Sequence, residues 1–243
     1  MTVHSAEEQK VALVIYSVIK VTDKPEFAQS FRKGLLHFQK VKSFRDGLHD
    51  DSQRHDEYEG VIATFQPGKV RIEFNNAVIN GNDITSPILM HDNSLLEKYA
   101  FCMYSINSKN WTTIAEDQIE AFKTDMVVDS SIGRFGDHST IILNVAKFIA
   151  RVQSAVQSKG YACRMGLVEY YDVNVVNEMF AQKRFGFQKT DKLRAQNEFR
   201  IIMDSNPTSN DEPWDFEIGN IEDITATIPT RDLRGSFRME MQD

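Results

Sequence analysis

The sequence has few cysteines and no long apolar run, and each shortage excludes a class of protein. The two cysteines among its 243 residues, Cys102 and Cys163, form no Cys-x-x-Cys pair, so neither a disulfide framework nor a structural zinc site is expected. Both lie in apolar, strand-like runs and are expected to be buried free thiols. No apolar run approaches the roughly 20 residues that a membrane helix requires. The first residues lack the basic flank and apolar stretch of a secretory signal, which favours a cytoplasmic protein.

The short motifs of common enzymes are also missing. The chain has no glycine-rich dinucleotide or phosphate loop, no Gly-x-Ser-x-Gly nucleophile motif and no His-Glu-x-x-His metal motif. Its formal net charge is -7, so the average surface repels phosphate groups. General nucleic-acid binding is therefore not expected, although a local basic patch would still attract an anionic ligand.

The hydrophobic pattern predicts an α+β fold over residues 1–243, as a single domain. A mixed, largely antiparallel sheet with two or three packed helices is expected. The helices are predicted at 25–34, opened by Pro25, at 111–128, and at 145–160, capped by Asn144. Strands are predicted at residues 11–21, 35–41, 61–65, 70–76 and 99–106, after Gly136, and at 161–173 and 196–204. The strands of 61–86 are expected to form a meander with Asn80-Gly81 as a hairpin turn, followed by a loop over 87–95.

Two segments differ from the rest in composition. Residues 46–60 are rich in Asp, Glu and His, which favours a solvated loop; a lid or a metal-binding loop is the alternative. The spacing of these residues matches no known metal loop, so no metal site is predicted. Residues 205–243 begin as a polar loop and then alternate apolar and charged residues, which predicts a β-rich C-terminal segment.

The strongest candidate site lies near the end of the predicted sheet. Gln196, Glu198 and Arg200 alternate with apolar residues, so on a strand their side chains would share one face. An amide, a carboxylate and a guanidinium projecting together favour a polar, catalytic site. The alternative is the solvated face of an ordinary strand, on which Glu198 and Arg200 form a surface ion pair of little energetic value.

The pair Gln196-x-Glu198 resembles the Gln-x-Glu signature of the ADP-ribosyltransferases. That resemblance implies NAD as the substrate, with Glu198 holding the nicotinamide ribose and supporting an oxocarbenium-like transition state. Gln196 would then help to orient the acceptor. The superfamily also uses an Arg or His on an early strand and a Ser, Thr or Tyr on another. The candidates for these roles are His37, Tyr16, Ser139 and Thr140.

A second resemblance covers most of the chain. The sequence is similar to an uncharacterised bacterial and phage family with Phe-Arg and then Asp-x-x-Glu-Gly near the front, and Gln-x-Glu-Phe-Arg near the end. This resemblance implies one domain and supplies no function. The polar positions that match it are Arg45, Asp56, Glu59, Asp137, Lys183 or Lys189, Glu198 and Arg200.

A basic connection precedes the candidate strand. It interleaves cations with phenylalanines, a composition that binds nucleotides through phosphate pairing and stacking. The alternative is that the phenylalanines anchor a loop to the core. With Arg45 from the front of the chain, the candidate ligand-binding residues are Lys183, Arg184 and Lys189.

Three hypotheses for function follow. The first is a phage- or plasmid-type cytosolic protein that binds a host or defence-system partner; it predicts an acidic or apolar surface patch and no organised polar pocket. The second is an ADP-ribosyltransferase-like enzyme acting on NAD; it predicts a cleft where Gln196, Glu198 and Arg200 meet an early-strand His or Tyr. The third is a protein that binds a nucleotide or small signal without turnover.

Overall fold

The computed structural model describes residues 13–47, 55–75, 77–109, 111, 113–204 and 212–233. Over these residues the chain has an α+β fold with largely antiparallel sheets, which confirms the predicted class. None of the helices within these ranges has both the length and the apolar character to cross a membrane.

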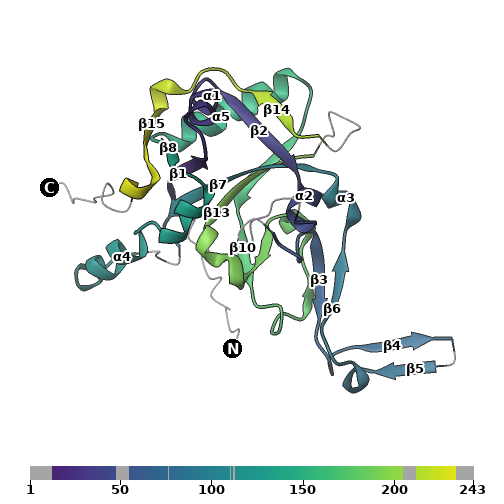
Figure 1. Ribbon diagram of the computed structural model, residues 1–243. Coiled ribbons are helices and arrows are strands. Elements are labelled where there is room, and N and C mark those ends of the chain that lie inside the picture. The colour runs from purple at the N-terminus through teal and green to yellow at the C-terminus, as the bar shows by residue number, and fades with distance from the viewer. Residues whose placement is uncertain are drawn as a thin grey trace, which may run out of the picture.

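The largest sheet is organised around one strand, β7 (Tyr99–Asn107), as Figure 1 shows. On one edge β7 pairs with β13, and β9 extends the sheet beyond β13. On the other edge β7 pairs with both β1 and β2; β8 and β15 continue beyond β1, and β14 continues beyond β2. These strands are β1 (Ile15–Thr22), β2 (Leu35–Lys40), β8 (His138–Ile142), β9 (Cys163–Leu167), β13 (Glu198–Met203), β14 (Trp214–Glu217) and β15 (Thr225–Pro229).

A gap separates β1 from β2 along β7. Ile19 of β1 pairs with Tyr104 and Gln39 of β2 pairs with Ala100, so no described strand lies beside the residues between them on this edge. Backbone groups alternate along a strand, and the N–H of Ser105 donates to the carbonyl of Asn197, which directly precedes β13 on that edge. The N–H and C=O of Cys102 therefore point into the gap. The Nζ of Lys20 donates to that C=O at 3.0 Å, so a side chain bonds where a strand would otherwise pair.

Two helices cover one face of this sheet. They are α1 (Pro25–Arg32) and α5 (Val145–Ser158), both predicted, and they lie together at the top of Figure 1. The Asn144 side chain accepts from the Lys147 N–H at 2.9 Å, which confirms the expected N-cap. Phe31 of α1 and Phe148 of α5 pack with β7 and β13 in the main core. The helix expected over 111–128 is shorter in the structure. Only α4 (Ile119–Asp125) is α-helical there, and a 3-10 turn (Glu116–Gln118) precedes it.

Smaller sheets extend from this body. β3 (Val61–Phe65) lies between β6 (Ile88–His91) and β11 (Glu178–Met179), while β10 (Glu169–Tyr171) and β12 (Gln188–Thr190) form a parallel pair. The hairpin of β4 (Arg71–Phe74) and β5 (Ala77–Asn80) projects away from the rest (Figure 1). The remaining helices and 3-10 turns are α2 (Val41–Arg45), α3 (Asn93–Leu96), η1 (Gly81–Asp83), η3 (Ser130–Phe135), η4 (Gln182–Arg184), η5 (Asp191–Gln196), η6 (Glu222–Ile224) and η7 (Thr230–Asp232).

The hairpin turn predicted at Asn80-Gly81 is wrong. The chain reverses between β4 and β5, where Asn75 takes a left-handed conformation with φ 52°, and Asn80 ends β5 instead of turning. Asn tolerates that conformation better than most residues, so the neighbouring Asn-Asn pair competed with Asn80-Gly81 as a turn signal. The loop expected over 87–95 instead holds β6 and α3, whose first turn is capped by Asp92.

The described part of the polar segment 46–60 includes two buried acidic residues. Residues 48–54 lie outside the described ranges, as do 205–211 and 234–243 of the C-terminal segment. Within 55–60, however, Asp56 is 3% exposed and Glu59 is fully buried, so the interpretation as a solvated loop is wrong for both. The backbone N–H of Asp56 donates to Phe44 of α2, and the carboxylate of Glu59 pairs with Arg200.

Candidate functional site

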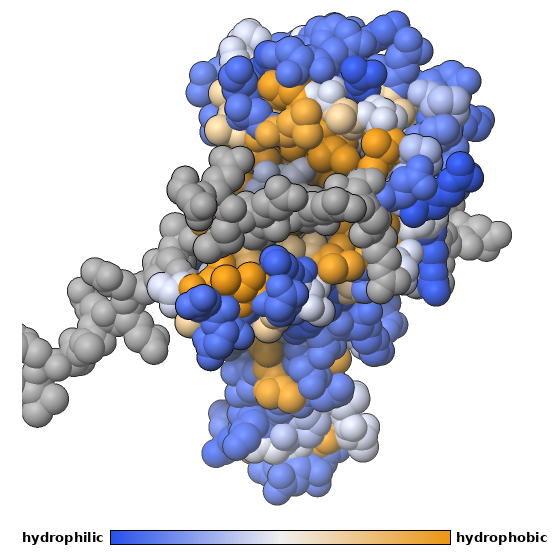
Figure 2. All heavy atoms as spheres, turned by 90° about the vertical axis from the view of Figure 1, so that its left-hand side faces the viewer, coloured by the Kyte–Doolittle hydropathy of each residue, from blue (hydrophilic) through white to orange (hydrophobic). Residues whose placement is uncertain are grey.

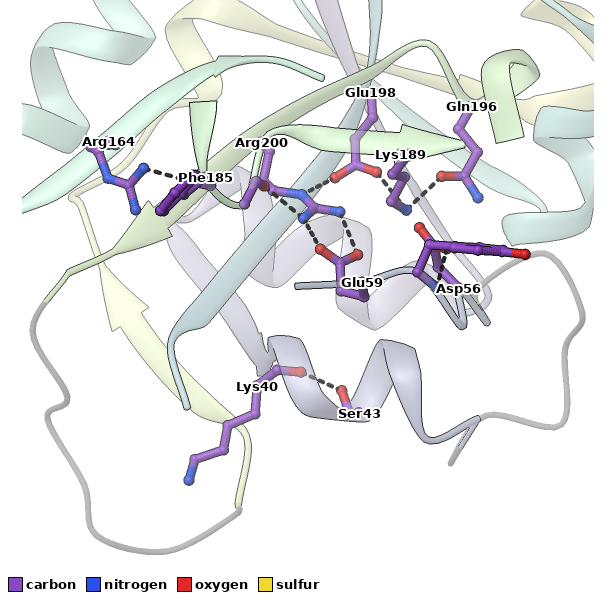
Figure 3. A network of polar contacts seen from close by, with 12 residues as sticks. Lys40, Ser43, Asp56, Glu59, Arg164, Phe185, Lys189, Gln196, Glu198 and Arg200 are labelled. Atoms are coloured by element: carbon purple, nitrogen blue, oxygen red, sulfur yellow. Dashed lines mark hydrogen bonds and ion pairs between the residues drawn. The ribbon is translucent and has the colours of Figure 1, made fainter. Parts of the chain in front are cut away.

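A buried network of charged side chains lies beneath the sheet, centred on Arg200 (Figure 3). The guanidinium of Arg200 is fully buried and binds the Glu59 carboxylate twice, NH1 to Oε1 at 2.5 Å and NH2 to Oε2 at 3.0 Å. Its Nε donates to Glu198 Oε1 at 2.5 Å, and NH1 also donates to the Gly186 carbonyl at 2.8 Å. This arrangement explains how so large a cation is buried, because each of its nitrogens is bonded.

Glu198 links the arginine to a buried lysine. Its second oxygen lies 2.9 Å from Lys189 Nζ, which also donates to Gln196 Oε1 at 2.8 Å. Burial alone would raise the pKa of Glu198, but the charges of Arg200 and Lys189 hold that pKa well below its usual range. Burial would likewise lower the pKa of Lys189, and the Glu198 charge raises it instead. Glu198 is therefore an ionised carboxylate whose oxygens are both engaged.

Asp56 adds a third buried acid. Its Oδ1 accepts from the Tyr58 N–H at 3.0 Å, whereas its Oδ2 is buried without a hydrogen-bond partner. Burial, and then the charge of Glu59, raise the pKa of Asp56 to about 6. Above that pH the network holds three negative groups, Asp56, Glu59 and Glu198, against the two positive groups Lys189 and Arg200.

Local structure explains why these residues meet. Strand alternation directs Glu198 and Arg200 to one face of β13, and Phe199, Ile201 and Met203 to the main core on the other, as predicted. β12 supplies Lys189. Just before β12, Gly186 adopts φ 81°, and a Cβ there would lie 2.6 Å from Ile202 Cδ1, so a glycine lets the chain approach β13 closely.

A cavity of about 560 Å³ adjoins the network at the gap between β1 and β2. Residues of three separate core clusters border it, so it reaches from one face of the sheet to the other. Its lining includes Lys189, Gln196 and Glu198 at the network, Lys20 and Cys102 in the gap, and the aromatic side chains of Phe27, Phe31, Phe44, Phe101 and Phe135. Apolar side chains gather in the middle of the face shown in Figure 2. On the wall of the cavity itself, Phe27 is 53% exposed. The cavity therefore has an apolar wall that reaches solvent.

Polar side chains of β2 and β14 also line this cavity. His37 Nδ1 lies 2.6 Å from Asp215 Oδ1, and His37 Nε2 lies 3.0 Å from Gln39 Nε2. His37 and Asp215 are more than half exposed. The cavity thus combines two sets of polar groups with an aromatic wall, which is the usual composition of a small-molecule site.

The structure brings together only some of the predicted catalytic residues. Glu198 and Arg200 share a face, but the interpretation of a surface ion pair is wrong because both are buried. Gln196 does not lie on the strand: it ends η5, and Asn197 follows in a left-handed conformation with φ 39°. Gln196 and Glu198 nevertheless line the same cavity as His37, whereas Arg200 lies behind Glu198 and does not line it.

The basic connection does not form one patch. Lys189 is buried in the network, whereas Arg184 pairs with Glu169 at 2.6 Å and with Glu178 at 3.3 Å. Arg45 pairs with the adjacent Asp46 at 3.0 Å. Neither Lys183, Arg184 nor Arg45 lines the cavity, so these three cations do not join Lys189 there. The cations of this connection therefore have separate partners: Lys189, on β12, pairs with Glu198, and Arg184, before β12, pairs with Glu169. That Lys183, Arg184 and Arg45 bind a ligand stays a prediction.

Other candidates lie elsewhere in the fold. Thr140 bonds to Thr227 across the β8–β15 pairing, Ser139 bonds to Thr230 just after β15, and Tyr16 packs on Phe122. None of these residues lines the cavity. Of the polar positions that match the second resemblance, Asp56, Glu59, Lys189, Glu198 and Arg200 meet in the network.

Sequence reasoning missed Lys20 and Cys102 as lining residues. Lys20 lies 4.3 Å from the centre of the Phe101 ring, and the only sequence signal for it is a cation at the end of an otherwise apolar run. Burial raises the pKa of the Cys102 thiol to about 12, so this thiol is not a nucleophile at neutral pH.

Comparisons with protein-family models, with curated proteins and with solved structures gave no match. The case for a function therefore depends on the geometry of this site.

Proposed function

We propose that the protein binds a small ligand of the nucleotide class in the cavity between β1 and β2, without turnover. The observation that supports this proposal most is that Glu198, Gln196 and His37, from distant parts of the chain, line one aromatic-walled cavity of about 560 Å³. Cavities of about 300–1,000 Å³ are typical of small-molecule sites.

The chemistry of the lining suits a ligand with a planar ring and polar ends. The phenylalanines offer faces on which a base stacks. The side-chain oxygens of Glu198 and Gln196 are bonded to Arg200 and Lys189, but each has a second lone pair that can accept from a sugar hydroxyl group. The ammonium of Lys20 lies in the gap between β1 and β2, where it would attract a phosphate.

Binding without turnover is preferred because of the state of Glu198. An ADP-ribosyl transfer needs a carboxylate that can turn toward the developing positive charge of the substrate. Here Arg200 and Lys189 each bind one oxygen of Glu198, and its side chain is 5% exposed. The transferase hypothesis stays a second candidate, because Gln196, Glu198 and His37 line the cavity that it requires.

The proposal is tested by titrating NAD, ATP and GTP against the protein and measuring heats of binding and the shift of the thermal unfolding midpoint. Saturable binding of one of them is expected, and Phe27→Ala should weaken it about tenfold by removing one aromatic wall. Phe74→Ala is the matched control, because Phe74 is 72% exposed on the hairpin and does not line the cavity. Absence of saturable binding for all three nucleotides would refute the proposal.

A product assay separates binding from transfer. Incubation with NAD should release no nicotinamide, in the wild type or in Glu198→Gln. Nicotinamide release by the wild type that Glu198→Gln abolishes would establish the transferase instead. His37→Asn is a second variant for the same product assay. Because the His37 side chain is more than half exposed, this substitution should not prevent folding.

A host or defence-system partner stays a prediction. The described surface that favours it is the hairpin, where Ile72 pairs with Ile79 and Phe74 with Ala77, so that the four side chains share one apolar face. Phe74→Asp should abolish binding of a partner that uses this face and leave nucleotide binding unchanged. Equal partner binding by both proteins would exclude the hairpin.

A further inference from the structure

The main chain of β7 is open to the cavity at Cys102. On one side, the N–H of Val41 donates to the carbonyl of Lys98 at 2.9 Å, so the even-numbered residues of β7 turn their N–H and C=O groups toward β1 and β2. On the other side, the N–H of Ser105 donates to the carbonyl of Asn197 at 2.8 Å, so the odd-numbered residues turn theirs toward β13. Both bonds place the N–H and C=O of Cys102 in the gap between β1 and β2.

These two backbone groups are not paired with a strand. Within the ranges that the structure describes, β1 pairs with β7 no further than Tyr104, and β2 no further than Ala100. The C=O of Cys102 accepts from the side chain of Lys20, and no described group accepts from the N–H of Cys102. A main-chain N–H normally has a partner, and Cys102 lines the cavity, so a bound ligand can supply the missing acceptor.

The gap fits the edge of a ring better than a peptide strand. Tyr104 and Ala100, the paired positions on either side, are separated by roughly 13 Å of β7 at about 3.3 Å per residue. A strand that paired with Cys102 would run on to the positions that β1 and β2 already hold. A planar ring with a donor beside an acceptor needs only the N–H and C=O of one residue.

Aromatic side chains line the cavity on both faces of the sheet. Hydrogen bonds between strands lie in the plane of the sheet, so a ring bonded to Cys102 would lie in that plane as well. Phe31 lines the cavity on the face that carries the Phe101 side chain, and Phe44 lines it on the face that carries the Cys102 side chain. Such a ring would therefore have aromatic lining on both of its faces.

We infer that the base of the bound nucleotide pairs with the main chain of Cys102 through its Watson–Crick edge, which adenine and guanine both offer. An acceptor of the base takes the N–H, and the neighbouring donor, such as the amino group of adenine, binds the C=O. That donor replaces the ammonium of Lys20, whose flexible stem lets it turn toward the phosphates. The inference rests on the proposed function and deepens it, because it assigns base recognition to a backbone position and gives the Cys102 thiol no part.

Nuclear magnetic resonance with ¹⁵N-labelled cysteine tests this inference, because Cys102 and Cys163 then give the only two labelled amide signals. Cys163→Ser leaves one label and so assigns both signals. Saturation with whichever of NAD, ATP and GTP binds should move the Cys102 amide proton downfield and slow its exchange with solvent. The Cys163 signal is the internal control and should stay in place, because Cys163 lies on β9 and does not line the cavity.

The edge of the base gives a second readout on the wild-type protein. The form of the bound nucleotide that is methylated at ring nitrogen N1 cannot present this edge and should bind about tenfold more weakly, whereas the 7-deaza form keeps the edge and should bind like the parent. Binding that leaves the Cys102 signal in place, with equal affinity for the N1-methylated form, would overturn the inference and leave the proposed function standing. Absence of binding by all three nucleotides would refute both.

Discussion

Glu59 and Arg200 lie 141 positions apart in the chain, yet they form a doubly bonded ion pair from which solvent is excluded. The pair ties the turn before β3 to the middle of β13. A buried ion pair adds little stability over an apolar pair of the same shape, but breaking this one removes from the buried Arg200 the carboxylate that binds it twice and leaves only Glu198 as its acidic partner. The pair therefore fixes which segments meet.

Glu59→Gln should destabilise the protein by about 3–5 kcal/mol, because the positive charge of Arg200 keeps only Glu198 as an acidic partner. Urea unfolding measures the loss as a change in the free energy of unfolding. Glu73→Gln is the control, since Glu73 pairs with Arg71 on the surface and should cost less than about 1 kcal/mol. Similar losses in the two variants would mean that Arg200 is solvated.

Asp56→Asn should stabilise the protein progressively as the pH rises. The pKa of Asp56 is raised from 3.8 to about 6, so the native state binds its proton more tightly than the unfolded chain does. Stability from this group is full below pH 4 and is lost as the pH rises to 6. The difference between variant and wild type should thus grow by on the order of 3 kcal/mol over that window, at about 1.4 kcal/mol per pKa unit.

Urea unfolding at intervals from pH 4 to 7.5 measures this difference. Glu198, whose pKa is lowered, contributes stability in the opposite sense, present above its unfolded pKa and lost in acid. That contribution is common to both proteins and cancels. A difference that does not change with pH would show that Asp56 has an ordinary pKa.

Gly186→Ala should cost more than Gly160→Ala. Both glycines have positive φ, 81° and 70°, so each alanine pays about 1–2 kcal/mol for the left-handed backbone. At Gly160 a Cβ meets no atom within 4 Å, whereas at Gly186 it lies 2.6 Å from Ile202 Cδ1. Overpacking adds about 1–3 kcal/mol there. Equal unfolding free energies in the two variants would mean that Ile202 moves aside without cost.

Asn144→Ala should destabilise the protein by about 1 kcal/mol through the loss of the α5 N-cap. Asn144→Asp is the matched variant, because a carboxylate oxygen accepts the same bond from Lys147. In thermal unfolding, the midpoint of Asn144→Asp should lie near that of the wild type, and the midpoint of Asn144→Ala should lie below both. A loss shared by Asp and Ala would point to another role for the Asn144 amide.

The α+β class could be predicted because helix starts and strand alternation are visible within short stretches of the sequence. Pro25 and Asn144 mark helix starts, and the alternation from Glu198 to Met203 marks a strand with one polar face. The polar face was ambiguous because a charged residue on a strand is most often solvated. Only the distant partner Glu59 makes Arg200 a buried residue, and that pairing is not encoded within any short window.

The candidate site was predicted only in part: of the named residues, Gln196, Glu198 and Lys189 line the cavity, whereas Lys183, Arg184, Arg45 and Arg200 do not. Asp56, Glu59 and Arg200 were among the polar positions singled out in the sequence, and the fold brings them together, while the family to which they were compared stays a prediction. The place of Gln196 was missed, because the left-handed Asn197 ends the alternation one residue early. The cavity could not be foreseen, since it arises where two strands stop short along β7.

The gap beside β7 also has a mechanical consequence. Among the described strands, β7 alone connects the β2–β14 pair to the β1–β8–β15 group. β2 is joined to β7 at only two paired positions, next to the cavity. A small hinge rotation of β2 and β14 about that contact would therefore widen or narrow the cavity mouth while the longer ladders of β7 with β1 and β13 stay intact. Of the ladders that β7 forms, the one with β2 has the fewest paired positions, and the buried side chains of Leu36, Phe38 and Phe216 would have to shift with such a rotation.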